Sequence, residues 1–162
     1  MKIYIATDHA GFELKETLKA YLGTLGHEVV DKGAFTFDAQ DDYPDFVRPC
    51  AEAVAADTES LGVVLGGSGQ GEAICANRVK GIRAAVFYGP MLPVGATDVS
   101  GRESTDPFEL ITLAREHNNA NILSLGSRFL TEANAKTAVK LFVEGVFPKA
   151  ERNVRRITKL DL

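Results

Sequence analysis

Features that would define several classes of protein are scarce in this chain of 162 residues. Its 18 Lys and Arg residues are outnumbered by 22 Asp and Glu, and the formal net charge of −4 leaves no global positive field to hold a nucleic acid or an anionic membrane. Its apolar runs are far shorter than the roughly 20 residues needed to cross a bilayer. The N-terminus lacks the apolar region of a signal peptide, so a cytoplasmic protein is expected.

Cysteine is also rare. The two cysteines, Cys50 and Cys75, lie in different segments without CxxC spacing, and a chain of this length does not need a disulfide to fold. We therefore expect both to be buried thiols. The sequence also shows no cluster of His, Cys and carboxylate residues with the spacing of metal ligands.

The apolar residues that are present alternate between two patterns. Short runs rich in Val, Ile and Leu predict strands covered on both faces, and they span residues 2–7, 28–31, 62–65, 83–87 and 122–125. Between them, apolar residues recur at helical intervals. These intervals predict, among other helices, a short one carrying Ile74, Ala76 and Val79 and a longer one carrying Ala135, Ala138, Val139, Leu141, Phe142 and Val146. The chain therefore predicts one α/β domain over residues 1–162, a three-layer α-β-α sandwich with a five-stranded parallel, Rossmann-like sheet.

Two irregular stretches, Lys32–Pro44 and Tyr88–Pro107, each follow the end of a predicted strand. In an open parallel sheet the carboxyl ends of the strands form the edge where ligands bind, so both loops are candidate walls of a site. A surface insertion without a role is the alternative for the second loop.

The densest cluster of glycines is Gly66-Gly67-Ser68-Gly69-Gln70-Gly71-Glu72, between a predicted strand and a short helix. Glycine allows close approach of a ligand, and successive free N–H groups at a helix start form a cradle for anions. The segment does not match a nucleotide-binding fingerprint, because GxxxxGK[ST] is absent and Glu72 breaks GxGxxG. A glycine-rich turn without a ligand is the alternative.

Glu72 falls in the first turn of that predicted helix. It lies four residues after Ser68, so the spacing does not fit a capping box, although it can still complement the helix dipole. The helix start favours the ionised form, whereas burial would raise the pKa of Glu72, and the sequence leaves the balance open. Asp8 and His9 directly follow the first predicted strand, where Asp8 can also cap the next helix.

Two further groups of residues are ambiguous. His117 ends a predicted helix, where it can act in chemistry or simply interact with the helix dipole. Arg152 and Arg156 are spaced to share one helical face near the C-terminus, with Arg155 between them. Such a cluster can be a solvated surface or a phosphate clamp, since guanidinium groups bind phosphate oxygens well.

A series of motifs stands in fixed order along nearly the whole chain. They are Asp8-His9-Ala10-Gly11, Asp42-Tyr43-Pro44, the glycine segment 66–72 with Ala76-Asn77, Gly81-Ile82-Arg83-Ala84, Arg115-Glu116-His117-Asn118-Asn119 and Gly126-Ser127-Arg128. Together they strongly resemble the type B ribose-5-phosphate isomerases, a family that also contains the galactose-6-phosphate isomerase subunits.

The resemblance implies an aldose–ketose isomerase that interconverts D-ribose 5-phosphate and D-ribulose 5-phosphate through an enediolate, without metal or organic cofactor. Glu72 matches the base of the glutamate-using branch, while the other branch has a cysteine at the position of Gly66. Ser68 would move protons between the oxygens. The enediolate would be stabilised by backbone amides of the segment Gly67, Ser68, Gly69, Gln70 and Gly71.

The remaining matches are to substrate contacts. His117 matches the acid/base that opens the sugar ring. Asp8 and Asn118 match contacts to sugar hydroxyls, and the matched phosphate ligands are His9, Arg128, Arg152 and Arg156. In the family some of these residues come from a second subunit. We therefore expect a homodimer or homotetramer with a shared active site, in which the arginine-rich tail, residues 149–162, contacts the partner subunit.

Two departures separate this chain from the family pattern. Extra residues around 89–108 precede the predicted helix that carries His117, and Asn153 stands where the family usually has histidine after arginine. Both changes leave open another aldose phosphate of four to six carbons as substrate. A sugar-phosphate sensor without activity and a nicotinamide dehydrogenase are the remaining alternatives, the second disfavoured by the missing fingerprint.

Overall fold

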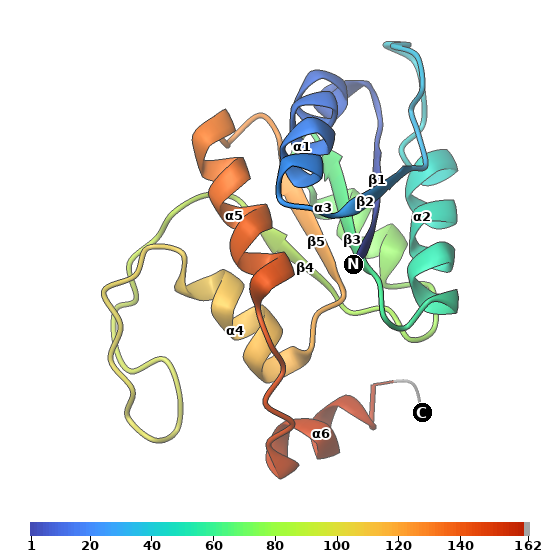
Figure 1. Cartoon of the computed structure of the whole chain (residues 1–162). Helices are drawn as coiled ribbons and strands as arrows, with labels where there is room; N and C mark the ends of the chain where they lie inside the picture. The colour runs from blue at the N-terminus through green and yellow to red at the C-terminus, as the bar shows by residue number, and fades with distance from the viewer. Residues whose placement is uncertain (161–162) are drawn as a thin grey trace.

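A five-stranded parallel sheet forms the centre of the computed structural model, which describes residues 1–160 (Figure 1). The strands lie in the order β2-β1-β3-β5-β4, and all neighbouring pairs are parallel. Every residue of β3 and β5 is buried, as expected for strands covered on both faces. The bounds are β1 (Lys2–Thr7), β2 (Glu28–Asp31), β3 (Leu61–Gly66), β4 (Ala84–Phe87) and β5 (Ile122–Gly126).

Helices cover both faces of this sheet. The α-helices are α1 (Phe12–Thr24), α2 (Pro44–Ala56), α3 (Gln70–Ala76), α4 (Glu109–Asn118), α5 (Glu132–Glu144) and α6 (Glu151–Ile157), and a short 3-10 helix, η1, spans His9–Gly11. One apolar cluster joins the sheet to α1, α4 and α5, and a second joins it to α2 and α3. The predicted three-layer α-β-α sandwich is therefore confirmed (Figure 1).

Both cysteines belong to the layer formed by α2 and α3. Cys50 and Cys75 are free and buried, as predicted. Burial raises the pKa of Cys50 to about 12 and also raises the pKa of Cys75, so both thiols stay protonated at neutral pH.

Helical spacing overestimated two helices. The structure ends α3 at Ala76, before Val79, and its Ile74 is 60% exposed. It ends α5 at Glu144, because the next residue, Gly145, has extended backbone angles, and Val146 is exposed. Ile74 and Val146 matched the helical period without being core residues, whereas Val79 packs against the second apolar cluster from outside the helix.

The order in which strands are added to the sheet reverses after β2. The chain adds β2 on one side of β1 and then crosses to add β3 on the other side, which makes a switch point between β1 and β3. In open α/β sheets, a switch point of this kind forms a crevice at the carboxyl ends of the strands, and ligands bind there. In contrast, α4 ends at the opposite edge of the sheet, and α6 packs near that end (Figure 1). No helix among residues 1–160 is long and apolar enough to span a bilayer.

Candidate active site

The glycine segment joins β3 to α3 at the switch point. Gly69 precedes α3 with a φ of 75°, which favours glycine, and a Cβ there would lie 2.9 Å from the carbonyl carbon of Leu125. Ser124 in the middle of β5 fixes the turn, donating its hydroxyl hydrogen to the Gly69 carbonyl at 2.7 Å. The first amides of α3 therefore open toward the crevice without carbonyl partners in their own helix.

Glu72 lies in the first turn of α3 and is only 4% exposed. Its carboxylate folds back over the end of β3, so that a Cβ on Gly66 would overlap it. The observed position of the Glu72 carboxylate therefore requires glycine at position 66. A cysteine at position 66 would displace the carboxylate from this place.

Burial raises the pKa of Glu72, and the nearby negative charge of Asp8 raises it further. A hydrogen bond from the backbone amide of Glu72 itself opposes the shift without cancelling it. Of the two opposing effects weighed from the sequence, burial therefore dominates over the helix start.

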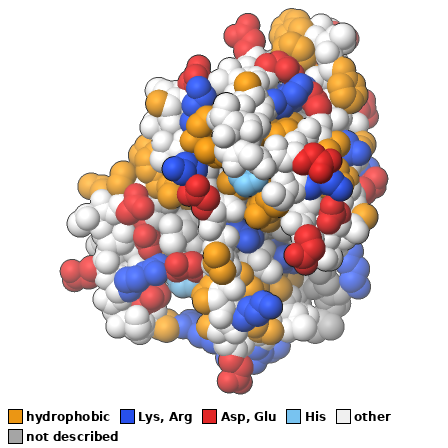
Figure 2. All heavy atoms as spheres, in the orientation of Figure 1, with side chains coloured by type: hydrophobic (Ala, Val, Ile, Leu, Met, Phe, Trp, Pro, Cys, Tyr) orange, Lys and Arg blue, Asp and Glu red, His pale blue; other side chains and the backbone are white. Residues whose placement is uncertain are grey.

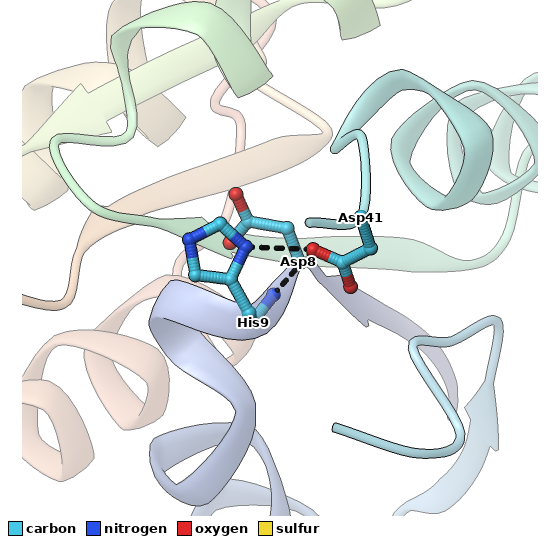
Figure 3. Close-up of side chains that lie close together, drawn as sticks. All are labelled: Asp8, His9 and Asp41. Atoms are coloured by element: carbon cyan, nitrogen blue, oxygen red, sulfur yellow. Dashed lines mark hydrogen bonds and ion pairs between the residues drawn. The ribbon is translucent and has the colours of Figure 1, made fainter. Parts of the chain in front are cut away.

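Asp8 and His9 follow β1 on the other side of the crevice. Asp8 is buried and accepts a hydrogen bond from the Ala10 amide at 2.9 Å, which confirms it as a cap. His9 contacts Asp41 twice: its backbone N–H donates to Oδ1 at 3.0 Å, and its ring Nδ1 lies 2.7 Å from the same oxygen (Figure 3). This carboxylate raises the pKa of His9, favouring the imidazolium form that binds anions.

The group Asp8, His9 and Asp41 also contains the candidate ligand atoms for a metal ion, all within 4.8 Å of one another. In the structure, however, Nδ1 of His9 and Oδ1 of Asp41 already pair with each other, and a metal bound by both atoms would replace this contact. Their geometry fits a hydrogen-bonded pair in which Asp41 orients the ring and leaves Nε2 free (Figure 3).

Three further residues of the crevice had no role assigned from the sequence. Ser127 donates to the carbonyl of Ala10 at 3.0 Å and also lies 2.5 Å from the Gly66 carbonyl, so it ties η1 to the end of β3. Tyr43 packs against Gly71, where a Cβ would come within 2.9 Å of its ring. Asp41 lies in the loop before α2 that was predicted as a wall, but its pairing with His9 was not predicted.

Arg128 completes this group. It follows β5, and a Cβ on Gly67 would lie 3.4 Å from its guanidinium carbon. We call the crevice formed by residues 8–9, 66–72 and 126–128 the glycine cradle. Of the predicted site residues it brings together Asp8, His9, Gly67, Ser68, Gly69, Gln70, Gly71, Glu72 and Arg128.

His117, Arg152 and Arg156 lie elsewhere, in a cavity of about 400 Å³ that we call the arginine pocket. Asn153 and residues 96–100 of the loop before α4 complete its lining. Within residues 1–160 neither arginine has an ion pair or a side-chain hydrogen bond, so both guanidinium groups are available to an anion. Asn118 lines a neighbouring cavity at the same edge of the sheet.

One chain keeps the two groups of residues apart. The glycine cradle lies at the carboxyl ends of the strands, and the arginine pocket lies where α4 returns to the start of β5. A parallel strand rises about 3.3 Å per residue, so the five residues of β5 alone separate the edges by about 15 Å. Within a single chain, Glu72 therefore does not face Arg152, Arg156 or His117.

Asn153, the second departure from the family pattern, has a structural contact. Its buried side-chain amide donates to the carbonyl of Glu116 at 3.3 Å, which ties α6 to the last turn of α4. This contact holds Arg152 beside His117.

On the face shown in Figure 2, basic and acidic side chains are interspersed, in agreement with the lack of a global positive field.

The fold and the glycine cradle define an α/β protein that carries a glycine-rich segment and a buried carboxylate at the switch point of a parallel sheet. Comparison with known families is more specific. The chain belongs to the Ribose/Galactose Isomerase family, whose model matches residues 3–92 and 106–160. The unmatched residues, 93–105, fall within the loop that the sequence identified as an addition.

Known relatives agree over the full length. Ribose-5-phosphate isomerase B of Mycolicibacterium paratuberculosis is 44% identical over 157 residues, which cover 97% of this chain and 87% of the relative. A crystal structure of ribose-5-phosphate isomerase B from Mycoplasma genitalium with bound ribulose-5-phosphate has a TM-score of 0.84 and 36% identity, covering 98% of this chain and 93% of its own. The enzyme from Thermotoga maritima has a TM-score of 0.82 and 38% identity, covering 99% and 97%.

Proposed function

We propose that this protein interconverts D-ribose 5-phosphate and D-ribulose 5-phosphate through an enediolate. The observation that carries the proposal is the buried Glu72 carboxylate, which lies over Gly66 beside the free amides of the glycine cradle. The activity agrees with the names of the relatives, including one whose structure holds ribulose-5-phosphate. Glycine at 66 supports a place in the glutamate-using branch.

Glu72 acts as the base. In the forward direction it takes the proton from C2 of the open-chain aldose and returns it to C1, so no net proton is lost. Its raised pKa makes it a stronger base than an ordinary glutamate, provided that the pH stays high enough to keep it ionised. The carboxylate is ready for this step because it has no cationic partner among residues 1–160.

The glycine cradle stabilises the negative charge that develops on the substrate oxygens. Ser68 carries a proton from the C2 hydroxyl to the oxygen on C1, while amides of residues 67–71 donate hydrogen bonds to the enediolate. Amides fixed by the Gly69 turn need no reorganisation when the charge appears.

Two copies of the chain form each complete site. His117, which opens the sugar ring, and the phosphate ligands Arg152 and Arg156 lie too far from Glu72 of their own chain to share a pentose phosphate with it. A two-fold arrangement that places the arginine pocket of one chain over the glycine cradle of its partner unites them, giving a homodimer with two equal sites. The tail that carries α6 then contacts the partner, although Asp161 and Leu162 lie outside the described residues.

The test is a panel of four-, five- and six-carbon aldose phosphates, assayed with and without EDTA and in deuterated water. We expect isomerisation of ribose 5-phosphate that EDTA does not reduce, with solvent deuterium appearing on the reacting carbon. Binding without turnover or exchange would instead indicate a sugar-phosphate sensor.

A further inference from the structure

The insertion loop, residues 93–105, is the part of the chain that the family model leaves unmatched, and it forms one wall of the arginine pocket. Its base is closed by a hydrogen bond from the Met91 amide to the Pro107 carbonyl at 2.8 Å. Residues 96–100 reach back from this base and lie against the cavity that His117, Arg152 and Arg156 share.

Internal hydrogen bonds give the tip of the loop a defined shape. Oδ1 of Asp98 accepts from the Ser100 amide at 2.8 Å, the Ser100 hydroxyl at 2.6 Å and the Arg102 amide at 3.2 Å. The Thr97 amide donates to the Arg102 carbonyl at 2.7 Å. The segment that faces the cavity is therefore a turn held in shape by its own hydrogen bonds.

Arg102 fastens this turn to α4. Its guanidinium group lies 2.8 Å from Oε1 of Glu109 and 2.9 Å from Oε2 of Glu116, two carboxylates spaced by two helical turns. Glu109 is buried and also accepts from the Ser104 hydroxyl at 3.0 Å. Because Glu116 immediately precedes His117, these two ion pairs fix the loop relative to the residue that is proposed to open the sugar ring.

We propose that the insertion loop is a specificity-determining wall that limits the length of the sugar phosphate accepted by the arginine pocket. The inference rests on the proposed function, and it concerns which aldose phosphate is used. The arginines bind the phosphate, and residues 96–100 line the same cavity, so this segment limits the room left there for the carbon chain. A fixed wall discriminates by size because it cannot move aside for one additional carbon.

Three variants test this wall in the full protein. The first replaces residues 93–105 by Gly-Gly, a short turn that the neighbouring positions of Met91 and Pro107 can accommodate. The second, Arg102→Ala, keeps the loop but removes its ion pairs to Glu109 and Glu116. A third variant, Arg102→Lys, retains the positive charge but cannot contact both carboxylates in the same way. The control is Lys136→Ala, which breaks an exposed ion pair to Glu132 on α5, away from the pocket.

The measurement is the ratio of kcat/KM for a six-carbon aldose 6-phosphate to that for ribose 5-phosphate. We expect the loop replacement to raise this ratio by about tenfold or more and Arg102→Ala to raise it less, with Arg102→Lys between Arg102→Ala and wild type. Lys136→Ala should leave the ratio unchanged. Circular dichroism establishes that each variant is folded, and Arg102→Ala decides the matter if the replacement does not fold.

If both the Arg102→Ala variant and the loop-replacement variant are folded and active and the ratio is unchanged, the loop does not limit the length of the substrate. The proposed isomerase function would still stand. If the wild-type protein isomerises no sugar phosphate, the proposed function fails instead. Calorimetric binding of five- and six-carbon sugar phosphates to the same variants then still tests whether the loop limits the length of the ligand, because a size limit also appears in the ratio of dissociation constants.

Discussion

The glycine cradle and the arginine pocket differ in how far one chain completes them. In the cradle, Glu72 and Asp8 are buried, and hydrogen bonds from the Thr7 and Ser127 hydroxyls join the ends of β1, β3 and β5. In the pocket, the guanidinium groups of Arg152 and Arg156 have no partner within residues 1–160. Under the proposed function, the group for proton transfer is therefore prepared within one chain, whereas the cations proposed to bind phosphate are completed by the substrate and a second chain.

The largest effect is expected from Glu72→Gln, which removes the base but keeps the size of the side chain. We expect kcat to fall by about 10²- to 10⁴-fold, while sugar phosphate still binds through the arginines. A coupled assay of ribulose 5-phosphate formation and calorimetric binding separate the two effects. Wild-type turnover in this variant would remove Glu72 as the base.

Gly66→Ala tests the cradle without changing any polar group. The added Cβ overlaps the Glu72 carboxylate and must displace it, so we expect kcat to fall by about 10²-fold. The matched control is Gly23→Ala on α1, where a Cβ meets no atom within 4 Å. Equal activity of the two variants would show that the position of the carboxylate is unimportant.

Arg156→Ala tests the pocket, and Arg155→Ala is its control, because Arg155 is also exposed but does not line the cavity. A lost phosphate contact that is made equally in the bound and transition states should raise KM by about tenfold and leave kcat nearly constant. If both variants had the same modest effect, the arginines would be a solvated tail.

A smaller, pH-dependent effect is expected from Asp41→Asn. Asp41 raises the pKa of His9, so its loss lowers that pKa and His9 becomes neutral at a lower pH. We expect a KM a few times higher near neutral pH that returns toward the wild-type value as the pH falls and His9 is again protonated. A KM ratio that does not vary with pH would show that Asp41 acts only through geometry.

The strands and the glycine cradle could be predicted because their signals are local. Apolar runs marked all five strands, and the glycines of residues 66–71 directly precede Glu72 in the sequence. The contact between His9 and Asp41 joins residues 32 positions apart, and several acidic residues in that loop fit the sequence equally well. Loop conformation alone selects Asp41, just as it brings Arg102 to Glu116. The helical spacing placed Ile74 in a helix but did not predict that its side chain is exposed, because spacing does not show which face of a helix is covered.

The most direct measurement mixes two inactive variants, Glu72→Gln and His117→Ala. Each variant alone retains one intact half of every site, and a mixed dimer has one site in which both halves are intact. After dissociation and reassembly of an equal mixture, we predict about a quarter of the wild-type activity. A mixture as inactive as its parents would contradict a site shared between the glycine cradle of one chain and the arginine pocket of the other.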